Sequence, residues 1–391
     1  MNSPHQATPK RLWWLRIAAA AAILGCGVLI SRLKQPEEGV ATAPSAPAPD
    51  AARKPQAETS KGGGTAEVEL LLKLAVSKLG AAQSAKSAGD SLIDLRAALG
   101  RLPPGEASRV VQEFLNSGAD SSTRAPFALG PGGSLASAPT LRSFLLDYLE
   151  QIDPGAAARI GREILGKMES ADEWALALRS VAKFEPSDTT RDWLASKVRQ
   201  LLRHEPWLQD PSVGCLEAFD VAVHLGGSSL IPDLTRLLRM TNNQAVAHAA
   251  FLAADRLARS DPEPVLASLL PDFDMMNGRE STRAGYFAKA DISQAAQREL
   301  LEKYLLHPQL GESELEAFAD AFPSENSMVS HNLLTETRPR SGAEIRSRDA
   351  ASLQVVHRWM HDPRFQEIRP QLNSIRIRLE GFLGRKPDRT P

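Results

Sequence analysis

Apolar side chains recur with the period of an α-helix along most of the chain, and this period constrains the fold more than any other feature. The same spacing of about 3.6 residues is found in residues 68–79, 107–115, 194–202 and 365–382. Aromatic residues make up only 5% of the chain, and no run of alternating polar and apolar residues predicts a strand. The sequence therefore predicts an all-α fold. The clearest helical face, in residues 141–152, consists of Leu141, Phe144, Leu145, Tyr148, Leu149 and Ile152.

Asp-Pro pairs stand at or just before several of the predicted helices, where Asp can cap free amides and Pro fits the first turn. Counting from Pro103, the intervals between successive prolines are 51, 57, 51 and 101 residues. These intervals favour a repeat of about 50 residues, each containing a helix pair. The alternative is that Asp-Pro is simply a common way to open a helix. The pairs are Asp153-Pro154, Asp210-Pro211, Asp261-Pro262 and Asp362-Pro363.

Residues 210–270 place small residues where antiparallel helices would approach closely, and leucines where helix layers would stack. In this pattern the segment resembles HEAT-like (armadillo-type) repeats, over roughly a sixth of the chain. The resemblance implies an α-solenoid of antiparallel helix pairs, whose concave surface binds another protein. The residues that carry it include Ala218, Ala222, Leu225-Gly226, Leu237-Leu238, Ala249-Ala250, Ala253, Leu257 and Leu269-Leu270.

Near the N-terminus, residues 17–30 form one uncharged apolar run, and Trp13 and Trp14 precede it. Tryptophan is enriched at the membrane interface. We expect residues 12–33 to form a single transmembrane anchor, with residues 1–11 as a short cytoplasmic N-terminus and the rest periplasmic at a bacterial inner membrane. Two alternatives remain open: a cleaved signal peptide, and a lipoprotein signal that is lipidated at Cys26.

Residues 34–65 are rich in Pro, Ala and Gly. This composition cannot bury an apolar core, so we expect a disordered linker. Residues 66–383 are predicted to form the helical repeat domain, and residues 384–391 a basic flexible tail. The only cysteines are Cys26 and Cys215, so the sequence contains no disulfide framework. Cys215 lies in the apolar pattern of a predicted helix, and we expect it in the core.

No motif in the sequence predicts catalysis, a cofactor or a metal. The glycine-rich segment 130–133 is not followed by Gly-Lys-Ser/Thr, and its Pro131 removes an amide that a phosphate loop would use. His357 and His361 have helical i, i+4 spacing but lack the neighbouring glutamate of a zinc-protease helix. Residues 272–278 do not match a calcium loop, because Arg283 stands at the position of the bidentate glutamate.

The formal net charge of -1 gives no broad basic field, and we expect no nucleic-acid partner. The leading interpretation is a membrane-anchored scaffold that binds another envelope protein through two loops, residues 118–140 and 272–290. The alternative is a helical-toroid enzyme acting on envelope polysaccharide, with a site gathered from distant loops. A helical-repeat DNA-binding protein fits less well, and the oligomeric state stays open. The candidate partner-binding residues are Arg124, Phe127, Arg279, Arg283 and Tyr286.

Overall fold

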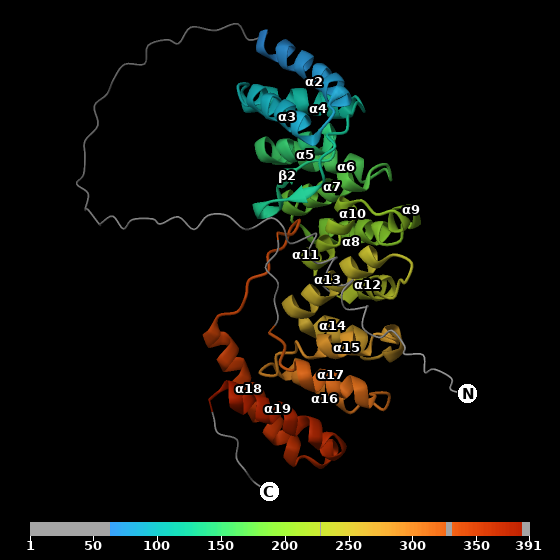
Figure 1. Ribbon diagram of the computed structural model, residues 1–391, viewed down its shortest axis with the longest axis vertical. Helices are drawn as coiled ribbons and strands as arrows, with labels where there is room; N and C mark the ends of the chain where they lie inside the picture. The colour runs from blue at the N-terminus through green and yellow to red at the C-terminus, as the bar shows by residue number, and fades with distance from the viewer. Residues whose placement is uncertain (1–62, 227, 326–330, 385–391) are drawn as a thin grey trace, which may run out of the picture. The chain divides into compact units, whose positions relative to one another are not determined.

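The computed structural model describes residues 63–226, 228–325 and 331–384, all within the compact unit Thr59–Pro391. Helices dominate these residues, which confirms the all-α prediction (Figure 1). In chain order the elements, with η for a 3-10 helix, are α2 Gly63–Ala81, α3 Ala85–Leu99, α4 Pro104–Asn116, β1 Ala128–Leu129, η1 Pro131–Gly133, β2 Leu135–Ser137, α5 Leu141–Ile152, α6 Pro154–Ile164, α7 Ala171–Phe184, α8 Asp188–Leu201, α9 Glu205–Gln209, α10 Val213–Glu217, α11 Asp220–Leu225, η2 Ser228–Leu230, α12 Ile231–Leu238, α13 Gln244–Ser260, α14 Pro262–Leu269, η3 Phe273–Met276, α15 Glu280–Phe287, α16 Ala295–Leu305, α17 Glu312–Ala321, α18 Gly342–His361, η4 Pro363–Ile368 and α19 Arg369–Phe382.

The helices of this unit pack mainly on near neighbours in the chain. Helix α2 packs on α3 and α4, α6 on α7, α12 on α13, α15 on α17, and α18 on α19. Figure 1 shows α2–α4 and α18–α19 at opposite ends of the unit, with the other helices in layers between them. This arrangement is compatible with a helical repeat.

Ion pairs between successive helix layers show how many residues of the chain separate one layer from the next. The paired residues, which lie 29 to 36 positions apart, mostly join alternate helices such as α5 and α7 or α15 and α17. The predicted interval of about 50 residues therefore does not describe the layers. The pairs are Arg142–Glu173, Arg179–Glu150, Arg179–Asp147, Arg203–Asp233, Arg256–Asp220 and Arg283–Glu314.

The Asp-Pro pairs open helices in some places only. Asp153 caps α6 and accepts a hydrogen bond from the Ala156 amide at 2.9 Å, and Asp261 precedes α14 without a side-chain bond. Asp210 instead ends α9, and Ser212 caps α10. Asp210-Pro211 still lies just before α10, but Ser212 rather than Asp210 caps its exposed amides.

The structure differs from three further predictions. Residues 118–140 contain an antiparallel pair, β1 and β2, joined by η1, although the sequence predicted no strand. Residues 272–290 are mostly helical, in η3 and α15, and do not form a long loop. The first helical turn of α2 includes residues 63–65, so the predicted linker ends earlier than expected.

The predicted anchor, residues 12–33, lies outside the described residues, as do residues 34–62 of the linker and 385–391 of the tail. Within the described ranges, none of the helices combines the length and the apolar character needed to cross a bilayer.

Candidate functional site

A long connection between two helices returns to the middle of the unit. Twenty residues, 322–341, separate α17 from α18, although α17 packs directly on α19. Connections between packed helices usually need only about 2–8 residues, and longer ones often carry function. Residues 331–336 form a turn closed by a bridge between His331 and Glu336. We call this turn the tip.

The tip is held by one buried carboxylate. Asp220, at the start of α11, is 1% exposed. Its Oδ2 accepts the amides of Leu334 at 2.7 Å and Thr335 at 2.8 Å, and its Oδ1 accepts the Thr335 hydroxyl. Arg256 of α13 donates to Oδ1 at 2.9 Å and balances the charge. A buried carboxylate with this many donors is well satisfied. Asp220 therefore recognises two successive backbone amides.

A second buried ion cluster holds the loop that contains β1, η1 and β2, which we call the hairpin (residues 128–137). Arg179 of α7 is 1% exposed, and it bonds Glu150 at 2.8 Å and Asp147 at 2.9 Å. The same guanidinium donates to the carbonyl of Gly133 in η1. Lys183, one turn further along α7, donates to the neighbouring glycine carbonyl at 3.1 Å. These cations fix the hairpin through its backbone.

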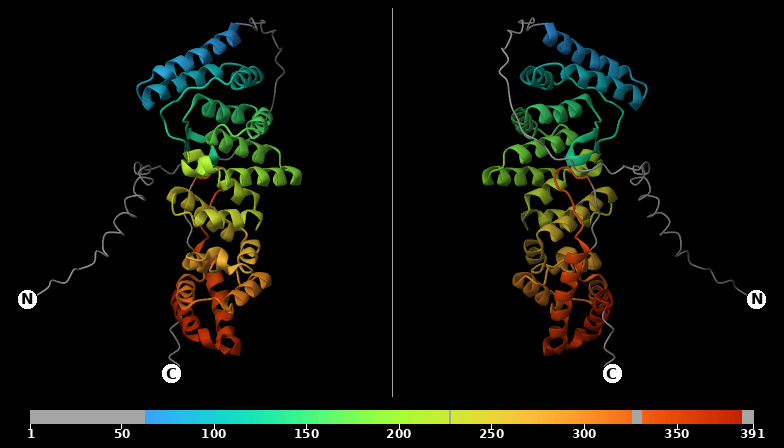
Figure 2. Two further views of the ribbon diagram at one scale, coloured as in Figure 1. Left: turned by 90° about the vertical axis from the view of Figure 1, so that its right-hand side faces the viewer. Right: turned by 90° about the vertical axis from the view of Figure 1, so that its left-hand side faces the viewer.

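The tip and the hairpin touch each other (Figures 1 and 2). A Cβ on Gly133 would lie 2.8 Å from the carbonyl carbon of Leu333 and closer still to its oxygen, so only glycine fits there. Leu333 itself is fully buried. We call Gly133, Asp220 and residues 333–335 the junction. Two segments about 200 residues apart in the chain thus meet at one face of the helix layers.

One acid near the junction has an unusual proton affinity. Burial raises the pKa of Glu217, in α10, to about 7, the positive charge of Arg256 lowers it by less, and Asp220 raises it slightly. A carboxyl group that is protonated near neutral pH is the kind of group that acid-base catalysis uses. Burial also raises the pKa of the Cys215 thiol to about 12, so this cysteine remains a neutral core residue.

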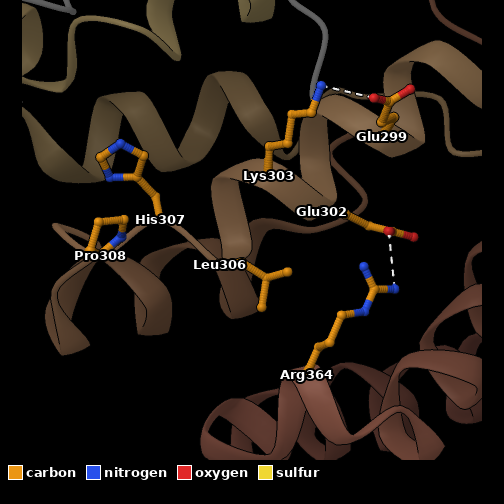
Figure 3. Close-up of a pocket in the computed structure, with 7 residues that line it drawn as sticks. All are labelled: Glu299, Glu302, Lys303, Leu306, His307, Pro308 and Arg364. Carbon is orange, nitrogen blue, oxygen red and sulfur yellow. Dashed lines mark hydrogen bonds and ion pairs between the residues drawn. The ribbon is translucent and has the colours of Figure 1, made fainter.

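A shallow hollow of about 450 Å³ lies where α16 meets η4 (Figure 3). Its charges already have partners, since Lys303 pairs with Glu299 at 2.8 Å and Arg364 with Glu302 at 3.5 Å. His307, at its edge, stacks on Phe273 with 3.9 Å between ring centroids. Among the described residues no group of three or more His, Cys, Asp or Glu side chains could hold a metal ion.

The five residues that the sequence proposed for partner binding separate into two groups. Arg124, at φ 59°, and Arg279 are exposed in this structure. Phe127, Arg283 and Tyr286 are buried, with 4%, 2% and 1% exposure. Arg283 and Tyr286 lie on the inner face of the helix formed by residues 280–287, and the Phe127 side chain enters the core. None of the three can therefore touch a partner while the helices stay packed.

Arg283 has an internal role instead. Its guanidinium bonds both oxygens of the buried Glu314 at 2.7 and 2.5 Å, and it lies 3.6 Å from the centre of the Phe273 ring. Tyr304 donates to the same carboxylate at 2.9 Å. Arg283 therefore joins α15 to α17 and belongs to the interlayer pairs.

No known family model, curated protein or solved structure gives a significant match to the chain. The residues that build the junction, Gly133, Asp220 and 333–335, were not predicted from the sequence, and neither was Arg179, which holds the hairpin. The signals that could have indicated them are the paired glycines at 132–133 and the apolar Leu333-Leu334 within a long polar connection.

Proposed function

We propose that this protein is a scaffold of the bacterial cell envelope, tethered to the inner membrane by residues 12–33, which binds another envelope protein on its helical layers. The observation that carries the proposal is how charged side chains of the helices are used. Asp220, Arg179 and Lys183 hold the backbones of two loops in fixed positions. Fixed loops on a rigid helical frame are typical of a binding surface.

The contact surface we propose is the side of the unit where the hairpin lies, together with the exposed Arg124 and Arg279. Ala136 of β2 is exposed beside the buried anchors. The ionic groups below the hairpin are satisfied internally, so the hairpin offers shape and backbone edges to a partner, while Arg124 and Arg279 add exposed positive charge.

The membrane tether rests on the sequence. Residues 17–30 contain no charged side chain, and the Pro- and Ala-rich stretch that follows suits a spacer between a bilayer and a folded unit. Alkaline carbonate extraction of cell membranes tests this part. The full chain should stay with the membrane pellet, and a chain lacking residues 12–33 should move to the supernatant. Release of the full chain would refute the tether.

Site-specific photo-crosslinking in cells tests the partner surface. A photoreactive amino acid at Ala136, Arg124 or Arg279 should give one discrete adduct with another protein. The control position is the exposed Glu205 of α9. Figure 1 shows helix α9 on the side of the unit away from β2. Adducts of equal yield at the control position, or none at the three test positions, would contradict the proposal.

Glu217 favours a second candidate, a helical enzyme acting on envelope polysaccharide. A carboxyl with a pKa of about 7 could serve as a general acid, and Asp220 lies three residues further along the chain. However, Asp220 is 1% exposed and engaged by Thr335 and Arg256, so a substrate could not reach it. Release of reducing sugar from cell-wall polysaccharide by the full chain, abolished by Glu217→Gln, would favour the enzyme over the scaffold.

A further inference from the structure

Helix α2 exposes apolar side chains along one stripe. Leu70 is 57% exposed and Leu74 is 43% exposed. With Glu67 and Lys78 they occupy positions i, i+3, i+7 and i+11, which lie on a single face of a helix. The stripe is therefore continuous over most of the length of α2.

The opposite face of α2 is the one that packs into the unit. Val68, Leu72, Ala75 and Leu79 are all buried there, and the helix contacts α3 and α4. Helix α2 thus has apolar residues on two faces, although an end helix of a repeat array usually carries a polar outer face. An outer face of this kind indicates a contact surface.

The charges on the stripe are arranged with opposite signs at the two ends. Glu67 lies near the N-terminal end and Lys78 near the C-terminal end. Neither forms an ion pair with any residue in the described part of the chain. If two such helices lie antiparallel, each Glu67 faces a Lys78, whereas in a parallel arrangement like charges face each other.

We propose that the stripe is a self-association surface, where α2 packs antiparallel against α2 of a second copy of this chain. A two-fold axis that crosses the exposed face of α2 midway between Leu70 and Leu74 brings Leu70 of one copy against Leu74 of the other, twice. Each apolar pair is then flanked by a Glu67–Lys78 ion pair. The surface matches a second copy because its charges and its apolar residues are both complementary to those of the same surface turned by the two-fold axis.

The length of α2 limits the area that the proposed contact can bury, and so the affinity of the dimer. Helix α2 has 19 residues and is about 28 Å long. One helix face buries less than the roughly 800 Å² per partner of a standard stable interface, so the dimer belongs to the weak class and dissociates on dilution. This inference goes beyond the scaffold proposal and does not depend on the identity of any partner.

Light scattering coupled to size-exclusion chromatography tests the dimer, with the full chain in detergent at several concentrations. The wild-type chain should shift from monomer towards dimer as the concentration rises. Glu67→Lys and Lys78→Glu should each weaken the dimer by about fivefold or more, because the two-fold axis applies every reversal twice. The charge-matched control Glu316→Lys, on an exposed position of α17, should leave the dimer unchanged.

Restoring the complementarity should restore the association. The double variant Glu67→Lys/Lys78→Glu should dimerise like the wild type. A mixture of the two single variants should also form a heterodimer, since one chain then carries a lysine at both ends of the stripe and the other chain a glutamate at both ends. A monomeric wild type, single reversals without effect, or no recovery in the double variant and the mixture would each overturn the proposal. The scaffold proposal would stand in all three cases, because its tests measure membrane retention and cross-linking at other positions.

Discussion

Replacing Gly133 by alanine should detach the tip, while the same change at Gly132 should not. Both glycines have left-handed backbones, with φ of 66° at Gly132 and 75° at Gly133. Alanine at either position therefore carries a similar strain of about 1–2 kcal/mol. A Cβ at position 132 meets no atom within 4 Å, whereas at position 133 it overlaps the carbonyl of Leu333. The pair of variants isolates the effect of that overlap.

The size of the extra loss follows from the bonds at Asp220. To relieve the overlap the tip must move away from the hairpin, and the amides of Leu334 and Thr335 then lose their carboxylate acceptor. Each hydrogen bond to a charged group contributes about 1.5–3 kcal/mol. Loss of one or both bonds predicts that Gly133→Ala costs about 1.5–6 kcal/mol more than Gly132→Ala.

Hydrogen-deuterium exchange read by mass spectrometry measures this difference locally. A loss of about 2 kcal/mol corresponds to roughly thirtyfold faster exchange of a peptide covering the tip, because about 1.4 kcal/mol is a factor of ten. Thr335→Val removes the hydroxyl bond to Asp220 and should add little in the Gly133→Ala background, since the tip has already detached. Equal exchange of the tip in the Gly132→Ala and Gly133→Ala variants would refute this reasoning.

Three further predictions concern charge. Because the pKa of Glu217 is raised from about 4.5 to about 7, the folded protein holds a proton that the unfolded chain releases. The stability that this group contributes is present below pH 4.5 and is lost as the pH rises to 7. Glu217→Gln should therefore raise the unfolding free energy at pH 8 by about 1–3 kcal/mol and leave it nearly unchanged at pH 4. Arg283→Met should cost about 3–5 kcal/mol in denaturant unfolding because it leaves Glu314 charged and buried, and adding Glu314→Leu should recover much of the loss; additive losses would contradict this account. Arg364→Ala should not move the denaturation midpoint, because its ion pairs lie at the exposed surface, and a clear shift would show that the hollow beside α16 is structurally important.

Local periodicity was sufficient to predict many of the helices. The face read from residues 141–152 coincides with α5, and Leu141, Leu145 and Leu149 on that face are fully buried. Such a prediction succeeds because a helix buries side chains at a fixed spacing, whatever the rest of the chain does. Cys215 was likewise expected in the core and is fully buried.

The junction could not be predicted in this way. The bonds between Asp220 and the tip join residues 114 and 115 positions apart, and no local rule connects them. In addition, Asp220 recognises backbone amides, which every residue except proline provides. The residue types in the tip therefore give little indication that its amides bind the Asp220 carboxylate.

Two of the predicted partner-binding residues were misplaced for a different reason, which is the short length of their helix. Arg283 and Tyr286 were assigned to a loop, yet they lie on the inner face of α15. A short helix of eight residues gives only two turns of periodicity, too few to separate from a loop. The short length of a helix thus limits how well its apolar periodicity can predict it.

The interlayer ion pairs explain how such short helices keep a defined register. An apolar face of Leu and Ala can slide along its neighbour by one turn with little loss of buried area, since Leu and Ala recur at each turn. A buried pair such as Arg283–Glu314 or Arg179–Asp147 does not tolerate this slide, because separating the charges leaves both without a partner inside the core. The pairs recur between layers at 29 to 36 residues, so each layer is positioned on the one before it. The placement of Asp220, and with it the position of the tip against the hairpin, follows from this chain of fixed registers.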